Sequence, residues 1–222
     1  MSWYEQTGRE DDIVLSSRAR LARNYAAYPF PSHMKREEEE KIMDLASGVM
    51  EDYKKIKLSE VTPVQAGALM ERHLISPEML NGNVKRGVLL SPDEHVSIMV
   101  CEEDHLRIQA LCAGFDPRQV LDQVMKADDK LEKASDYAFS ETLGYLTHCP
   151  TNLGTGLRAS AMLHLPMMTE NGAIRALMDT TAKLGFAIRG LYGEGSAAQG
   201  ALYQISNQVT LGVTEEEIVY RL

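Results

Sequence analysis

The sequence predicts an α+β domain in which a mainly antiparallel β-sheet is flanked by helices. Several short runs with strand character follow one another directly along the chain, and stretches with helical periodicity lie between groups of them. A regular alternation of strand and helix, which would indicate a parallel sheet, does not fit this order. The 222 residues are enough for one sizeable domain.

In the first half of the chain, a strand is expected over residues 13–20, where an apolar start leads into a polar segment. Apolar residues from Ile42 to Tyr53 recur at helical spacing, which predicts a helix from residue 35 to about residue 57. Residues 84–90 and 95–100 are typical of two strands joined by a turn. Asp116 followed by Pro117 indicates the start of another helix.

In the second half, strands are expected over residues 144–147, 160–165, 186–189 and 202–211. An amphipathic helix is expected from Ile174 to Leu184, because Gly185 is a typical residue just after a helix end. Thr214 and Glu217 form the capping box that opens a last helix.

The composition excludes several classes of function. A net charge of −9 and a pI of about 5.2 do not suit a protein that binds nucleic acid non-specifically. No apolar run approaches the roughly 20 residues of a membrane span, and the first residues lack the pattern of a secretory signal. Three cysteines (Cys101, Cys112, Cys149) without a CxxC spacing favour a reduced, cytoplasmic setting and no zinc site.

Arginines beside glycines and carboxylates stand out against this acidic background. Within residues 16–20, Arg18 and Arg20 share a face if the segment is a strand, and two guanidinium forks suit a polyphosphate. A solvated basic strand edge is the alternative. If the strand after residue 100 stays extended, Glu103 and Arg107 share a face and Glu102 points away; the alternative is a salt-bridged strand end.

Two glycine-containing segments follow. Gly154, Gly156 and Ala159 match the G-x-G-x-x-A dinucleotide pattern, but that pattern requires a long helix where residues 160–165 predict a strand. A glycine loop that brings main-chain N–H groups and Arg158 to a phosphate fits better. Residues 189–196 form a second glycine-rich segment with one arginine and one glutamate, for which a plain surface turn is the alternative.

Taken together, these segments resemble the signature blocks of the phosphagen (guanidino) kinases. The blocks are VLSSRARLARN, EEDHLRIQ, GYLTHCPTNLGTGLRAS and RGLYGEGSAAQGALYQISNQVTLGVTEEEI, in the family order. The resemblance is greatest to the bacterial protein arginine kinases of the McsB type. It implies the phosphagen-kinase catalytic domain, which is glutamine-synthetase-like. It also implies transfer of the γ-phosphate of ATP to arginine residues in proteins, with Mg²⁺ held mainly through the phosphates and no direct metal ligand.

The resemblance also assigns roles to individual residues. It places at the nucleotide site Ser16, Ser17, Arg18, Ala19, Arg20, His73, Arg107, Arg158, Ala159, Ser160, Ala161, Met162, Arg189, Gly190, Leu191, Tyr192, Gly193 and Glu194. Glu103 and Glu194 would hold the guanidinium, with Glu103 as the catalytic base, and Cys149 would modulate the acceptor end. Cys101 and Thr210 depart from the family, which usually has asparagine at the first position, while its small-molecule kinases have arginine at the second.

By the same resemblance, residues 1–222 would be a catalytic domain without the family's N-terminal helical domain and without a C-terminal phosphoarginine-binding region. An open site favours arginine-bearing proteins as substrates. A kinase for free arginine or another small guanidine, and a truncated inactive nucleotide-binding paralog, are the alternatives. The expected partners in a stress-response system are a zinc-binding activator protein and an AAA+ unfoldase, with no nucleic acid and no membrane.

Overall fold

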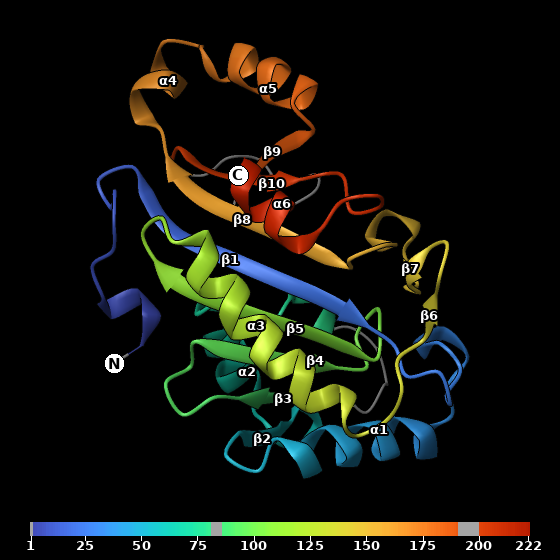
Figure 1. Ribbon diagram of the computed structural model, residues 1–222. Coiled ribbons are helices and arrows are strands. Elements are labelled where there is room, and N and C mark those ends of the chain that lie inside the picture. Colours follow the sequence, from blue (N-terminus) through green and yellow to red (C-terminus); the bar gives the residue numbers. More distant parts are fainter. Residues whose placement is uncertain (1, 81–85, 191–199) are drawn as a thin grey trace.

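A single eight-stranded sheet runs through the computed structural model, which describes residues 2–80, 86–190 and 200–222 (Figure 1). The strand order is β2 (Lys54–Lys57), β3 (Gly87–Leu90), β4 (Val96–Val100), β5 (Leu106–Ala113), β1 (Val14–Arg23), β8 (Leu157–His164), β10 (Leu202–Asn207) and β9 (Phe186–Gly190). All neighbouring pairs are antiparallel. The predicted α+β class with a mainly antiparallel sheet is confirmed.

Helices and a small hairpin complete the architecture. The helices are α1 (Arg36–Val49), α2 (Pro63–Glu71), α3 (Pro117–Glu132), α4 (Pro166–Glu170), α5 (Ile174–Lys183) and α6 (Glu215–Arg221). Short 3-10 turns are η1 (Trp3–Glu5), η2 (Pro31–His33), η3 (Leu58–Glu60), η4 (Pro77–Leu80) and η5 (Pro150–Asn152). Strands β6 (Phe139–Ser140) and β7 (Gly144–Tyr145) form the hairpin.

The main core lies between the sheet and α3, which crosses β1 and β5 on one face (Figure 1). The core side chains there are fully buried: Ala19 and Leu21 of β1, and Val120 and Val124 of α3. The Asp116 side chain accepts a hydrogen bond from the main-chain N–H of Gln119, which confirms the predicted start of α3. The opposite face of the central strands is therefore left for polar side chains.

Several predicted boundaries are wrong. Helix α1 ends at Val49, so Tyr53 is not on it; the chain turns and residues 54–57 pair with β3 as β2. Pairing with a neighbouring strand outweighs the helical pattern at this point. Strand β8 begins at Leu157, three residues earlier than expected, so Arg158 lies on a strand and not in a glycine loop.

Strand β10 ends at Asn207 although residues up to 211 were expected in it. The Asn207 side chain replaces strand pairing there: its amide donates to the carbonyls of Leu157 and Val209, and its oxygen accepts from the N–H of Ala159. Of residues 144–147, only Gly144 and Tyr145 form a strand. The Thr214–Glu217 capping box is present at α6, as predicted.

Candidate active site

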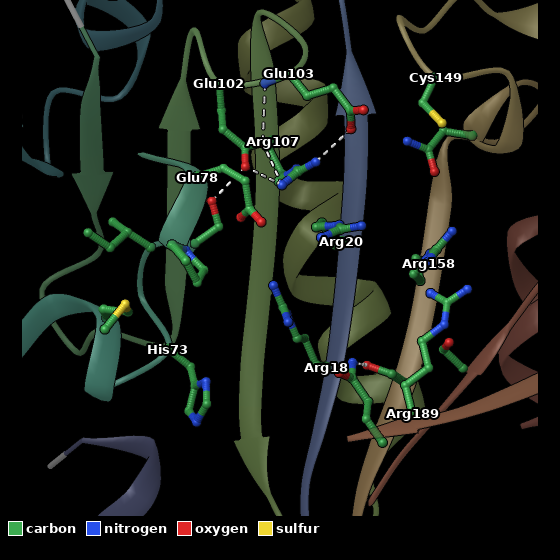
Figure 2. Close-up of a pocket in the computed structure, with 18 of the residues that line it drawn as sticks. Arg18, Arg20, His73, Glu78, Glu102, Glu103, Arg107, Cys149, Arg158 and Arg189 are labelled. Atoms are coloured by element: carbon green, nitrogen blue, oxygen red, sulfur yellow. Dashed lines mark hydrogen bonds and ion pairs between the residues drawn. The ribbon is translucent and has the colours of Figure 1, made fainter. Parts of the chain in front are cut away.

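A cavity of about 460 Å³ opens on the face of the sheet opposite α3 (Figure 2). It is lined by Arg18, Arg20, Met70, His73, Ile75, Ser76, Pro77, Glu78, Arg86, Glu102, Glu103, Arg107, Cys149, Thr151, Asn152, Arg158, Ser160, Arg189, Gln204 and Ser206. The lining therefore contains both arginine guanidinium groups and glutamate carboxylates.

Five of the six arginines that line this cavity lie on strands, and strand register places them on one face: Arg18, Arg20, Arg107, Arg158 and Arg189. Arg20 of β1 lies opposite Arg158 of β8, and Gln204 of β10 lies opposite Arg189 of β9. Arg18 and Arg20 alternate with buried Ala19, so both point away from α3, as predicted. Like charges directly across a sheet repel one another. The site therefore stores unfavourable charge that a bound polyanion would offset.

Burial and the neighbouring cations lower the pKa values of the two arginines on β1. Burial, and secondly the nearby Arg107, lower the pKa of Arg18 to about 10. Burial and the same Arg107 also lower the pKa of Arg20 well below its ordinary value. Arg18 is held by Gln109, whose Oε1 accepts from Nε at 3.1 Å and from Nη2 at 2.6 Å. In turn, the Gln109 amide donates to the carbonyl of His73 at 2.6 Å.

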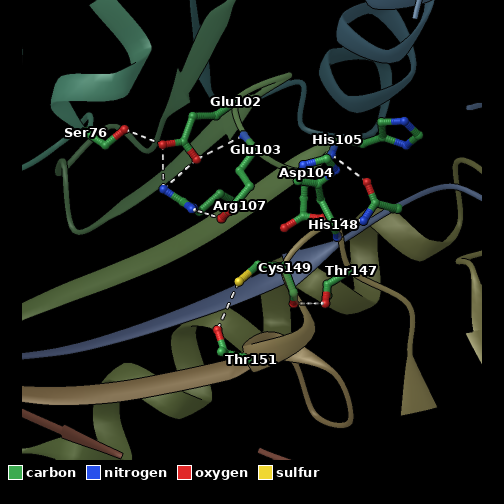
Figure 3. Close-up of polar contacts among 11 residues, drawn as sticks. Ser76, Glu102, Glu103, Asp104, His105, Arg107, Thr147, His148, Cys149 and Thr151 are labelled. Atoms are coloured by element: carbon green, nitrogen blue, oxygen red, sulfur yellow. Dashed lines mark hydrogen bonds and ion pairs between the residues drawn. The ribbon is translucent and has the colours of Figure 1, made fainter. Parts of the chain in front are cut away.

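Carboxylates occupy the other end of the cavity, on the tight loop 101–105 between β4 and β5. The N–H of Cys101 donates to the carbonyl of His105 at 2.9 Å, and Cys101 has a φ of +59°. Glu102 Oε1 accepts from Arg107 Nη1 at 2.5 Å and Glu103 Oε2 accepts from Arg107 Nη2 at 2.9 Å. One guanidinium thus holds both carboxylates (Figures 2 and 3).

The expectation that Glu102 points away from the site is wrong. Because residues 101–105 form a loop and not an extended strand, Glu102 and Glu103 both reach Arg107. The Glu102 side chain is 3% exposed and also accepts from Ser76 Oγ at 2.6 Å, whereas the Glu103 side chain is 36% exposed. Glu103 is therefore the carboxylate that an incoming group can reach.

Cys149 lines the cavity beside this carboxylate end (Figure 3). It precedes η5, and its Sγ lies 3.1 Å from Thr151 Oγ1. Thr210 supports the same turn, since its hydroxyl donates to the carbonyls of Thr151 and Leu153 at 3.1 and 2.7 Å. By contrast, Cys101 and Cys112 are buried, and burial raises the pKa of their thiols to about 12 and about 11.

The other residues expected at the nucleotide site divide by strand alternation. His73, Arg107, Arg158, Ser160 and Arg189 line the cavity together with Arg18 and Arg20. In contrast, the side chains of Ser17, Ala19, Ala159 and Ala161 do not line it, because they point to the α3 side of β1 and β8. The assignment of these four residues to the nucleotide site stays a prediction, and their side chains are not the groups that face the cavity.

The other residues assigned to the nucleotide site lie outside the cavity lining or outside the described residues. Ser16 and Met162 share the face of Arg18 but lie outside the cavity lining, and Gly190 ends β9. Leu191, Tyr192, Gly193 and Glu194 lie outside the described residues. Ser17 instead has a structural role: its hydroxyl donates to the carbonyl of Gly114 and accepts from the N–H of Asp116, each at 2.9 Å.

Sequence reasoning missed Glu102, Glu78 and Arg86 as cavity residues. For Glu102, a signal was available in the sequence: residues 102–105 are a polar run between two apolar strands, which is typical of a hairpin turn and not of a continued strand. Arg86 donates to the carbonyl of Cys101 at 3.2 Å and to that of Glu78, so it supports the carboxylate end.

The glycines at 154 and 156 do not belong to a dinucleotide-binding motif, because strand β8 follows them where that motif requires a helix. Gly154 has a φ of +100° and approaches the carbonyl of Thr210 so closely that a Cβ would lie 2.2 Å from it. Within the described ranges, no three His, Cys, Asp or Glu side chains gather into a group that could hold a metal ion. No helix in those ranges is long and apolar enough to cross a membrane.

Comparison with known proteins agrees with this geometry. The solved structure of the duplicated taurocyamine kinase from Schistosoma mansoni, with bound transition-state-analogue components, superposes with a TM-score of 0.86 and 27% identity. It covers 97% of this chain and 32% of that one. Lombricine kinase superposes with a TM-score of 0.84 and 25% identity, over 97% of this chain and 65% of that one. The predicted phosphagen-kinase fold is confirmed.

Sequence relatives are closer. The protein-arginine kinase of Desulforamulus reducens is 49% identical over 229 aligned positions, which cover 99% of this chain and 64% of that protein. The protein-arginine kinase of Bacillus cereus is 45% identical over 225 positions, covering 98% and 63%. The chain thus spans less than two thirds of the length of these relatives.

The model of the ATP:guanido phosphotransferase C-terminal catalytic domain matches residues 35–222. This match includes the carboxylate loop, β8 and the segment that carries Cys149. The chain belongs to the ATP:guanido phosphotransferase family.

Proposed function

We propose that this chain transfers the γ-phosphate of ATP to the guanidinium group of arginine side chains in proteins. The observation that carries the proposal is the division of one cavity into two ends. Arg18, Arg20, Arg158 and Arg189 lie on strands β1, β8 and β9 at one end, and the Glu102 and Glu103 carboxylates, held by Arg107, lie beside Cys149 at the other. Such a site accepts a polyanionic donor and a cationic acceptor side by side. The names of the sequence relatives support the same assignment.

At the phosphate end, the arginines act by charge and position. Phosphoryl transfer requires mainly alignment of the reactants and neutralisation of developing charge, and fixed guanidinium groups supply both. The set fits a nucleotide because each fork can bind phosphate oxygens in bidentate fashion. Mg²⁺ would be held mainly through the phosphates, where it supplies further charge neutralisation.

At the acceptor end, Glu103 is proposed as the base. A guanidinium has a pKa above about 12 and lacks a free lone pair while protonated. As the nitrogen–phosphorus bond forms, the bond between the γ-phosphorus and the ADP oxygen breaks, and the nitrogen's proton passes to the Glu103 carboxylate. Glu102 would stay fixed by Arg107 and Ser76. Glu194 is proposed as the second carboxylate on the acceptor.

A protein acceptor is distinguished from a free one by competition. The chain is incubated with ATP, Mg²⁺ and casein, and acid-labile phosphoarginine is measured by mass spectrometry with rising free arginine. A protein chemically stripped of arginine guanidinium groups serves as the control acceptor. Phosphoarginine on casein that persists in excess free arginine supports the proposal; its absence, or phosphorylation of free arginine alone, overturns it.

The wider setting follows only from the resemblance. A cytoplasmic stress-response role, a zinc-binding activator protein, an AAA+ unfoldase and a single catalytic domain over residues 1–222 stay predictions.

A further inference from the structure

The two loops that carry Glu103 and Cys149 are joined through one buried carboxylate oxygen. Asp104 directly follows Glu103, and His148 directly precedes Cys149. Asp104 is 0% exposed, and its Oδ1 accepts from the main-chain N–H of His148 at 2.7 Å (Figure 3). A single bond therefore ties the main chain beside the proposed base to the main chain beside the cavity thiol.

Asn24, just past the end of β1, completes this connection. Its Nδ2 donates to the same Asp104 Oδ1 at 2.6 Å and to the carbonyl of Leu146 at 3.1 Å. Its Oδ1 accepts from the N–H of His105 at 2.8 Å. Asn24 is 2% exposed, so both of its amide atoms bond inside the protein to the two loops.

His105 anchors the carboxylate loop on its other side. Its Nδ1 accepts from the N–H of Tyr25 at 3.0 Å, which leaves Nε2 to donate to the carbonyl of Pro29 at 2.7 Å. Burial is the main cause that lowers the pKa of this imidazole, which agrees with the neutral tautomer that these bonds require. The strand end, the carboxylate loop and the cysteine loop thus meet in one buried polar network.

A buried carboxylate is a costly way to hold loops together. Asp104 makes no ion pair with any described residue, and its Oδ2 has no hydrogen-bond partner in the described part of the chain. An apolar residue at this position would avoid that desolvation cost. The bond to His148 is what an apolar residue cannot supply.

We propose that Asp104, together with Asn24, is a positioning residue that fixes Glu103 relative to Cys149 across the acceptor end of the cavity. The catalytic consequence rests on the proposed function, whereas the coupling of the two loops does not. Misplacement of a reacting group by about 1 Å can lower a rate about 100-fold. We call the Asp104–Asn24 pair, with its bonds to His105, Leu146 and His148, the clamp. The arginine end of the cavity lies on the central strands and does not depend on the clamp.

The test compares Asp104→Leu with Asp104→Asn. Leucine keeps the branched shape of the side chain but removes the acceptor, whereas asparagine keeps a carbonyl oxygen with two lone pairs for both donors. Asp104→Leu should lower kcat for protein arginine about 100-fold and leave KM for ATP within about twofold, and Asp104→Asn should recover most of the rate. Val124→Ala, in the buried face of α3, is the control for lost stability alone.

The alkylation rate of Cys149 with iodoacetamide is the second readout, and it needs no kinase activity. Asp104→Leu should change this rate several-fold, about as Asn24→Ala does, while Val124→Ala should leave it unchanged. If Asp104→Leu does not fold, Asn24→Ala takes its place in both assays.

Either of two results would overturn the proposal. One is an unchanged alkylation rate in the clamp variants; the other is a Val124→Ala variant that reproduces the loss of kcat. Wild-type protein that makes no phosphoarginine would refute the proposed function instead, and the alkylation rates would still decide whether the clamp exists.

Discussion

Replacement of Arg20 by methionine should make the free protein more stable while it weakens the response to ATP. Arg20 suits this test because it makes no hydrogen bond to any described side chain, so its removal leaves no buried partner unsatisfied. Arg18 and Arg107 are less suitable, since Gln109 and Glu102 depend on them. The Arg20→Met change therefore removes mainly a desolvated cation from a cluster of cations.

The magnitude can be estimated from Arg18, the next cation on the same face, whose pKa is lowered to about 10. That fall, from an ordinary value of 12.5, corresponds to about 3.5 kcal/mol against the charged form, at about 1.4 kcal/mol per pKa unit. Both side chains remain partly exposed at the cavity wall, and water screens much of the repulsion. A gain of about 1–2 kcal/mol is therefore expected, or roughly 2–8 °C in Tm.

The sign of the effect does not change near neutral pH. The folded-state pKa of Arg18 lies below its unfolded-state value, so the protonated form opposes folding at every pH below about 10. The Tm gain of Arg20→Met should accordingly be the same at about pH 6 and about pH 8. This pH independence separates the charge effect from the titration of a histidine.

The response to ATP should move in the opposite direction. ATP at 100 times its Kd stabilises the wild type by about 2.7 kcal/mol. Loss of one charge-assisted contact weakens affinity by about 1.5–3 kcal/mol, so the same ATP concentration would stabilise Arg20→Met by only about 0.3–1.3 kcal/mol. Differential scanning fluorimetry with and without ATP and Mg²⁺ measures both values.

Arg175→Met is the matched control, because Arg175 is exposed on α5 and lies outside the cavity lining. It should change neither the Tm of the free protein nor the ATP shift by more than about 1 °C. An Arg20→Met protein that is less stable than the wild type, or that keeps the full ATP shift, would refute the reasoning.

Two further predictions concern the carboxylate end and the thiols. Arg107→Ala leaves the buried Glu102 without its cation and should cost about 3–5 kcal/mol in urea unfolding, and a loss below about 1 kcal/mol would contradict the assigned ion pair. Iodoacetamide should label Cys149 in the folded protein but label Cys101 and Cys112, whose pKa values burial raises, only in denaturant; peptide mass spectrometry that finds equal labelling would contradict this.

The sequence was sufficient where local rules decide the outcome. The shared face of Arg18 and Arg20 follows from strand alternation, and the helix starts at Asp116 and Thr214 follow from side-chain capping. The family resemblance named several residues that line the cavity, but it did not give the direction of each side chain. Ser17 and Ala19, which it assigns to the phosphates, have side chains on the α3 side of β1, and their place at the nucleotide site stays a prediction.

The sequence was insufficient where distant segments decide the outcome. Residues 54–57 follow a helical pattern, yet pairing with β3 makes them a strand. Glu102 reaches Arg107 only because residues 101–105 turn. The contact of Asp104 with Asn24 and His148 joins three segments far apart in the chain, and no spacing in the sequence indicates it.

The most direct test of the proposed function is phosphoarginine formation by the wild type and by Glu103→Gln under identical conditions. Glutamine keeps the size of the side chain but cannot accept the proton, so the rate should fall about 100- to 10,000-fold. The ATP-induced Tm shift should stay within about 1 °C of the wild type, because Glu103 is absent from the arginine set that would bind phosphate. Equal rates of phosphoarginine formation in the two proteins would contradict the account.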